Sequence, residues 1–139
     1  MCIRDRVFAT VHKQSVEAFF TEAQARRLRM ICGKVMMDRN APEALCDTPE
    51  SSYTQSQELI AQWHNKDRLG YAVTPRFAPT SSDAQLRMAG KLLTENPDVH
   101  LHTHLSENAA ECDWVSSLFP NRQDYLSVYE HFGLSLIHI

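Results

Sequence analysis

The sequence predicts an α/β fold with a parallel sheet. Short segments rich in β-branched and aromatic residues alternate with longer segments whose apolar residues recur at helical spacing, and strands joined by helices pair in parallel. A doubly wound sheet and a (β/α)8 barrel both fit this alternation. The glycine-rich phosphate loops that favour nucleotide-binding open sheets do not occur in the sequence. A complete barrel needs about 250 residues, so the 139 residues here could form about half of one.

The first part of the chain predicts two strands with a helix between them. Residues 7–12 have the β-branched and aromatic content of a strand. In the helix that follows, Ser15 is expected to cap the start and Gly33 suits the stop. The apolar residues 34–38 are expected to form the second strand.

The middle of the chain predicts a loop, a helix and a strand. Residues 40–52 contain two prolines together with Asp, Thr and Ser, which is typical of a loop. Residues 55–65 carry apolar side chains on one helical face. Residues 71–77 are expected to form the third strand, with a proline near its end, where a missing N–H is tolerated.

The last part predicts three helices and one strand. Ser82 and Gln85 match a capping box at the start of a helix. Residues 99–105 are expected to form the fourth strand, and residues 109–118 and 124–132 to form two further helices.

Composition and charge exclude several classes of protein. The 14 basic and 17 acidic side chains give a net charge of −3, whereas nucleic-acid-binding proteins normally carry a basic excess. An apolar content of 43% is too high for a disordered chain. No apolar run reaches the roughly 18 residues that a membrane helix needs. The four cysteines include no C-x-x-C pair, which fits a reducing cytoplasm better than a disulfide framework.

The most informative segment is His-Leu-His-Thr-His-Leu-Ser-Glu-Asn at residues 100–108. Strand side chains alternate between faces, so His100, His102 and His104 are expected on one face. His100 and His104 would lie about 13 Å apart along the strand, too far to bind one ion through bonds of about 2 Å. Neighbouring histidines, about 6.6 Å apart, could do so. The strand therefore offers at most two ligands to one metal ion.

Sites in parallel α/β proteins form at the carboxyl ends of the strands. That position favours His104 as a metal ligand. Glu107, three residues later, could take a proton from water that the metal activates and pass it to a leaving group. The alternative is that the histidines only complete the core or its rim, and that Glu107 is an acidic residue at the start of the next helix.

Arg76 and Phe77 end the preceding predicted strand and would face the same rim. Arginine offers a planar fork of donors, and phenylalanine a flat apolar wall, so the two could hold a heteroaromatic base. The alternative is an Arg76 paired with a nearby carboxylate and a Phe77 packed in the core.

The two ends of the chain differ from the rest. Residues 1–6 and 135–139 resemble translated adapter sequence, and we expect them to be non-native segments that carry no weight in predicting the fold. The native part is then expected to be residues 7–134, truncated at both ends.

Four motifs together resemble the guanine deaminases of the amidohydrolase superfamily. They are Phe-Ala-Thr-Val-His (8–12), Gly-Lys-Val-Met-Met-Asp (33–38), Thr-Pro-Arg-Phe (74–77) and Thr-His-Leu-Ser-Glu-Asn (103–108), with Ser-Val-Tyr (127–129) after them. The resemblance covers essentially all of residues 7–134. The combination is specific, although several amidohydrolases share the T-H-x-S-E element alone.

The resemblance implies part of a (β/α)8 barrel, with the predicted strands similar to the second through fifth. It implies metal-dependent hydrolysis of guanine to xanthine and ammonia, with zinc as the metal and iron also acceptable to such ligands. His104 resembles the family's zinc ligand, Glu107 its proton shuttle, and Arg76 and Phe77 the residues that hold the purine, whereas His102 has no ligand role. The parent protein is expected to be a cytoplasmic homodimer of purine catabolism, with no nucleic-acid or membrane partner.

The family's other metal ligands have no counterpart in this chain. They are an H-x-H on the first strand, a histidine on the sixth and an aspartate on the eighth, and catalytic zinc normally needs about three protein ligands. We therefore expect the chain alone to be inactive, and its open sheet edges to make it poorly soluble.

Two other functions stay open at this point. One is a deaminase or chlorohydrolase of the same superfamily that acts on another heterocycle, and the other is a non-catalytic α/β binding domain. The deaminases that bind zinc through H-x-E and P-C-x-x-C are excluded, because neither element occurs.

Overall fold

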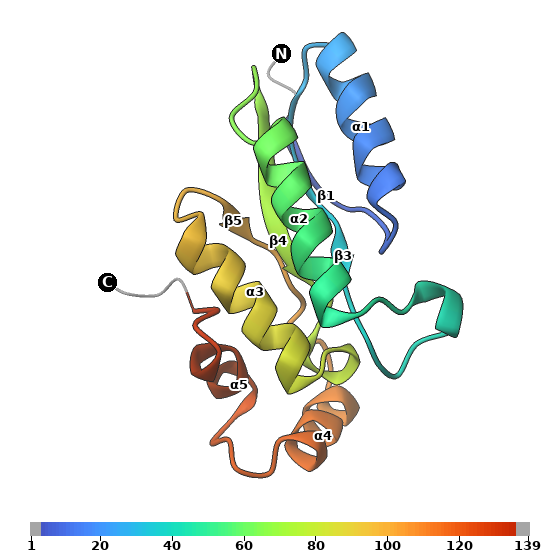
Figure 1. Cartoon of the computed structure of the whole chain (residues 1–139). Coiled ribbons are helices and arrows are strands. Elements are labelled where there is room, and N and C mark those ends of the chain that lie inside the picture. The colour runs from blue at the N-terminus through green and yellow to red at the C-terminus, as the bar shows by residue number, and fades with distance from the viewer. Residues whose placement is uncertain (1–3, 136–139) are drawn as a thin grey trace.

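A computed structural model of the chain describes residues 4–135 (Figure 1). In these residues one sheet contains β1 (Arg4–Phe8), β2 (Arg29–Gly33), β3 (Val35–Met36), β4 (Leu69–Pro75) and β5 (His100–Leu101). The helices are α1 (Lys13–Ala25), α2 (Pro49–Trp63), α3 (Asp83–Glu95), α4 (Ala109–Leu118) and α5 (Tyr125–His131). Helices α1, α2 and α3 lie together on one face of the sheet (Figure 1). None of the helices described is long and apolar enough to cross a membrane.

The strand order distinguishes between the two architectures that the sequence allows. All pairs are parallel; β1 borders β2, and β5 borders β4. The first part of β4 pairs with β2 and its end pairs with β3, so β2 and β3 occupy one position in the sheet. Four positions therefore follow one another in chain order, as in a (β/α)8 barrel, whereas a doubly wound sheet reverses its order. The predicted α/β fold with about four parallel strand positions is confirmed.

The second strand position differs from its prediction. The structure begins it with β2 at Arg29, ahead of the predicted residues 34–38, and α1 ends at Ala25. Arg27 has a φ of 55°, a left-handed conformation that a helix cannot continue through. Gly33 belongs to the sheet and does not end the helix. A Cβ atom there would lie 1.7 Å from the carbonyl oxygen of Ala72, so only glycine allows this close approach of β2 to β4.

Other boundaries shift by local capping. Helix α2 begins at Pro49, six residues before the prediction, because Thr48 and Ser51 form a reciprocal capping box at its start. The predicted loop 40–52 therefore contains a helix start. The predicted strand 99–105 keeps regular pairing only in the two residues of β5.

The predicted adapter segments lie mostly at the limits of the described chain. Residues 4–6 form part of β1 and pair with β2. Residues 1–3 and 136–139 of those segments lie outside the described residues. The non-native origin of residues 1–6 and 135–139 stays a prediction.

The core lies between the sheet and the helices. Alternate strand residues, among them Cys32, Met36, Tyr71 and Val73, are buried against apolar side chains of the helices. The intervening residues face the other side of the sheet, where Val35 joins a second, smaller cluster with Val11 and Met37. Each strand thus has a helix-facing side that stabilises the fold and an opposite side that is free to line a site.

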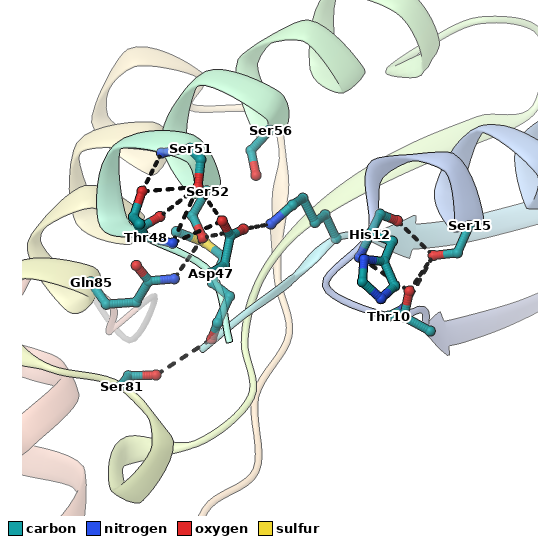
Figure 2. A network of polar contacts seen from close by, with 12 residues as sticks. Thr10, His12, Ser15, Asp47, Thr48, Ser51, Ser52, Ser56, Ser81 and Gln85 are labelled. Carbon is teal, nitrogen blue, oxygen red and sulfur yellow. Dashed lines mark hydrogen bonds and ion pairs between the residues drawn. The ribbon is translucent and has the colours of Figure 1, made fainter. Parts of the chain in front are cut away.

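A buried ion pair crosses the helix-facing layer. Lys34 is fully buried between β2 and β3, and its ammonium contacts the carboxylate of Asp47 just before α2. The same carboxylate accepts hydrogen bonds from the hydroxyls of Ser51 and Ser52 (Figure 2). Burial lowers the pKa of Lys34 to about 8. Keeping the ammonium charged in the core therefore costs free energy, which the contact with Asp47 offsets.

The network extends to α3 through Gln85, which the sequence predicts as part of the capping box of that helix. Ser82 caps α3 by accepting from the Gln85 amide (3.2 Å), as predicted. The Gln85 side chain does not complete the capping box. Its side-chain amide Nε2 donates to the hydroxyl of Ser52 at 2.7 Å (Figure 2). The Ser82 amide donates to Asp38 instead. Gln85 therefore joins α3 to α2.

Lys34→Met is expected to destabilise the chain by about 3–5 kcal/mol, because removing one partner of a buried pair leaves an uncompensated charge in the core. Chemical denaturation measures this loss. Lys13→Met is the matched control, since Lys13 pairs with Glu58 at the solvent-exposed surface, where ion pairs contribute little. Equal losses from the two substitutions would contradict the role given to the buried pair.

Candidate functional site

The site residues predicted from the sequence come together at the carboxyl ends of β4 and β5. Arg76, Phe77, His104 and Glu107 line one cavity of about 120 Å³. Arg76 and Phe77 directly follow β4, and His104 and Glu107 lie in the segment between β5 and α4. The edge of the sheet predicted to carry the site is the edge at which the four side chains meet.

His104 is held by the main chain of Arg76. Its amide donates to the Arg76 carbonyl oxygen at 3.0 Å, and its ring Nδ1 lies 2.9 Å from the same oxygen. A carbonyl oxygen can only accept, so Nδ1 carries the proton of this bond. In the neutral ring the lone pair is then on Nε2, the atom that a metal ion could bind.

Glu107 lies on the Nε2 side of the imidazole. Its Oε1 is 3.8 Å from His104 Nε2, which is longer than a hydrogen bond. Ser106, between them, has a φ of 54° and makes the turn that precedes Glu107. Asn108 then caps α4 by accepting from the Glu111 amide at 2.9 Å. The Glu107 side chain is more than half exposed, so its carboxylate is free to contact a ligand.

Arg76 and Phe77 form one wall of the cavity. The Arg76 guanidinium lies over the Phe77 ring at 5.3 Å, and the edge of Trp114 packs against Phe77. Among residues 4–135 Arg76 makes no ion pair, and one guanidinium nitrogen contacts the sulfur of Met37 at 4.0 Å. The alternative of an Arg76 paired with a nearby carboxylate therefore has no support in the described chain.

A second, larger cavity of about 300 Å³ adjoins the first and shares Arg76 and His104 with it. Its other walls are mostly apolar and come mainly from the end of β1 with the segment after it, and from β3 with the residue after it. They are Phe8, Ala9, Thr10, Val11, Val35, Met37 and Leu45. Together the two cavities offer a mostly apolar space lined also by a guanidinium, an imidazole and a carboxylate.

Phe8 contacts two of the three strand histidines and was not predicted as a site residue. Its ring centroid lies 3.9 Å from that of His102 and 4.5 Å from that of His104. His100 lies further along the same side of the sheet, near Gly70. The three histidines thus share one side of the sheet, as strand alternation predicts. No local pattern could reveal Phe8, because it approaches from another strand.

The described residues supply only part of a metal site. No group of three or more His, Cys, Asp or Glu side chains in residues 4–135 is placed to hold a metal ion. His104 offers an Nε2 oriented by the bond from Nδ1 to the main chain, and the Nδ1 of His102 is buried and has no hydrogen-bond partner in the described residues. The donor set therefore fits one ligand of a histidine-bound metal such as zinc.

Comparisons with known proteins identify relatives that match most of the chain. Residues 6–137 match the profile described as "Amidohydrolase family". Guanine deaminase of Escherichia coli (strain K12) is 59% identical over 129 residues, which are 93% of this chain and 29% of the relative. The chain therefore spans less than a third of the length of this curated relative.

Solved structures of the same kind superpose closely. The E. coli guanine deaminase structure matches with a TM-score of 0.94 and 57% identity, over 95% of this chain and 31% of that one. A guanine deaminase from C. acetobutylicum, with guanine bound in its active site, matches with a TM-score of 0.90 and 32% identity, over 94% and 31%. Both matches confirm the parallel α/β architecture as part of such an enzyme fold.

The hydrogen bond to Arg76 predicts the tautomer of His104. At a pH where the ring is neutral, long-range ¹H–¹⁵N correlation spectra should show Nδ1 protonated and Nε2 unprotonated. The exposed imidazole of His131, which has no such acceptor in the described structure, is the internal control. A protonated Nε2 on neutral His104 would contradict the arrangement.

Proposed function

Because the chain belongs to the amidohydrolase family, we propose that it forms part of the active site of a metal-dependent guanine deaminase, which hydrolyses guanine to xanthine and ammonia. The observation that carries the proposal is the meeting of Arg76, Phe77, His104 and Glu107 around one cavity. This cavity lies in a chain that is 59% identical to a guanine deaminase over 129 residues.

Each of the four residues has a role that its chemistry supports. His104 is proposed to hold the metal through Nε2, because Nδ1 is engaged by the main chain. A bound zinc ion supplies a Lewis acid that makes water a nucleophile near neutral pH. Arg76 is proposed to donate to the acceptor atoms of the purine, and Phe77 to pack against its ring.

Glu107 is proposed to move the protons of the reaction. Hydrolysis adds the oxygen of water to the carbon that bears the amino group and releases the amino nitrogen as ammonia. The carboxylate takes a proton from the attacking water and gives one to the departing nitrogen, so the residue ends the cycle unprotonated. Its exposed carboxylate on the Nε2 side of His104 supports this role.

The finer parts of the proposal rest on the family resemblance and on composition. They are zinc as the metal, with iron as the alternative, residues 7–134 as the native barrel segment, a homodimeric parent, a cytoplasmic location and a place in purine catabolism. The match of the family profile to residues 6–137 supports the barrel segment.

A chimera tests the proposed activity directly. Residues 7–134 would replace the aligned part of the E. coli guanine deaminase, which provides the rest of the barrel. We expect the chimera to release ammonia from guanine and to lose this activity on metal removal. A panel of other aminated and chlorinated heterocycles distinguishes the related amidohydrolases. A folded, metal-loaded chimera that prefers another heterocycle, or that is inactive on all of them, would contradict guanine as the substrate.

In the same chimera, Glu107→Gln is expected to lower kcat about 10²- to 10⁴-fold, the usual contribution of a general acid–base group, with little change in KM. Steady-state kinetics with guanine measure both constants. Glu130→Gln, at an exposed position on α5, removes the same charge away from the cavity and should leave kcat unchanged. A Glu107→Gln chimera with full activity would exclude the proposed proton transfer.

A further inference from the structure

The hydroxyl of Tyr129 lies where the two halves of the site meet. Tyr129 belongs to α5 and is buried, with 2% of its surface exposed. Its hydroxyl donates to the carbonyl oxygen of His104 at 2.8 Å and accepts from the amide of Ala78 at 3.0 Å. It also accepts from the hydroxyl of Thr103 at 3.1 Å. A phenol offers one donor and two acceptor positions, so its whole hydrogen-bonding capacity is used here.

These three partners belong to the two segments that carry the site. Thr103 and His104 form the segment proposed to bind the metal. Ala78 directly follows Phe77, in the segment proposed to hold the purine. Tyr129 therefore bonds to both segments from a distant part of the chain. It lies 25 residues from His104 and 51 residues from Ala78.

The Tyr129 hydroxyl bonds to the segments after β4 and β5 at a point beyond the regular strand pairing. The regular pairing of β5 with β4 ends at Leu101 and Val73. Beyond it, the main chains of the two segments are joined by the bond from the His104 amide to Arg76. That bond joins the two segments directly, whereas the Tyr129 hydroxyl bonds to both of them from the helix-facing side.

We infer that Tyr129 is a positioning residue of the proposed active site, setting the distance between the metal-binding segment and the purine-binding segment through its hydroxyl. The inference rests on the proposed function for its effect on catalysis. The hydrogen bonds themselves do not depend on that function. Misplacement of reacting groups by about 1 Å can lower a rate about 100-fold, so loss of this link should affect binding and turnover together.

Tyr125 provides a matched control. It lies one helical turn before Tyr129, is also buried (6% exposed), and stacks on it with the ring centroids 5.7 Å apart. Its hydroxyl takes no part in the three hydrogen bonds that join the Tyr129 hydroxyl to Ala78, Thr103 and His104. Replacing either tyrosine with phenylalanine removes one buried hydroxyl and keeps the ring. Only the replacement of Tyr129 removes the bonds to the site.

The first experiment compares Tyr129→Phe and Tyr125→Phe in the guanine deaminase chimera. We expect Tyr129→Phe to raise KM for guanine and to lower kcat, with kcat/KM falling about 10- to 100-fold. Tyr125→Phe should leave both constants unchanged. A purely structural effect would reduce the amount of folded enzyme without changing KM. Equal KM values in the two variants would overturn the inference.

The second experiment needs no activity and separates this inference from the proposed function. Amide hydrogen exchange at Ala78 is recorded in the chimera and its two variants. Removal of the acceptor should speed exchange at Ala78 at least about tenfold in Tyr129→Phe, with no change in Tyr125→Phe. If the chimera does not deaminate guanine, the proposed function fails and the exchange rates alone decide. Equal rates at Ala78 in the two variants would overturn the inference.

Two variants at Thr103 test the inference if the Tyr129→Phe variant does not fold. Thr103→Val removes the hydroxyl that donates to the phenolic oxygen and that also lies 3.3 Å from the Arg76 carbonyl oxygen, whereas Thr103→Ser keeps it. We expect Thr103→Val to raise KM and Thr103→Ser to restore it. Equal KM values in these two variants would count against the inference.

Discussion

The carbonyl oxygen of Arg76 is the acceptor on which the geometry of the site depends. It accepts from the amide and, at 2.9 Å, from the ring Nδ1 of His104. The first bond fixes the main chain after β5 relative to the main chain after β4. The second fixes the rotation of the imidazole and leaves Nε2 free. Because both bonds reach a main-chain atom, the Arg76 side chain remains free for the cavity. One residue thus orients the histidine through its backbone and lines the cavity through its guanidinium.

Strand alternation and strand ends were enough to predict where the candidate site lies. The pleat of a strand places His100, His102 and His104 on one side whatever the rest of the fold. The carboxyl ends of neighbouring parallel strands meet at one edge, which brings Arg76 and Glu107 together. Helix α4 was also predicted with its observed bounds. These features depend on local geometry and on chain order, and the sequence contains both.

The features that the sequence did not reveal depend on distant contacts. An apolar run such as Met30-Ile31-Cys32 fits a strand or the end of a helix equally well. The left-handed backbone at Arg27 ends the helix, and the close approach of Gly33 to Ala72, which is a tertiary contact, places the segment in the sheet. Phe8 and Tyr129 reach the site from other elements, so no spacing around the His104 segment points to them. Gln85 was predicted to cap its own helix, yet it bonds to Ser52 on the neighbouring one.

The neighbouring residues Gly33 and Lys34 also limit how the chain can misfold. If the second strand position paired with β4 one residue out of place, every side chain would change faces. The lysine would then turn toward Ala72, where even a Cβ atom has no room, and Asp47 would lose its cation. A uniformly apolar strand would tolerate such an error at little cost, because valine and methionine can pack on either face. The buried charge and the missing side chain beside it together make the incorrect alignment far less stable than the correct one.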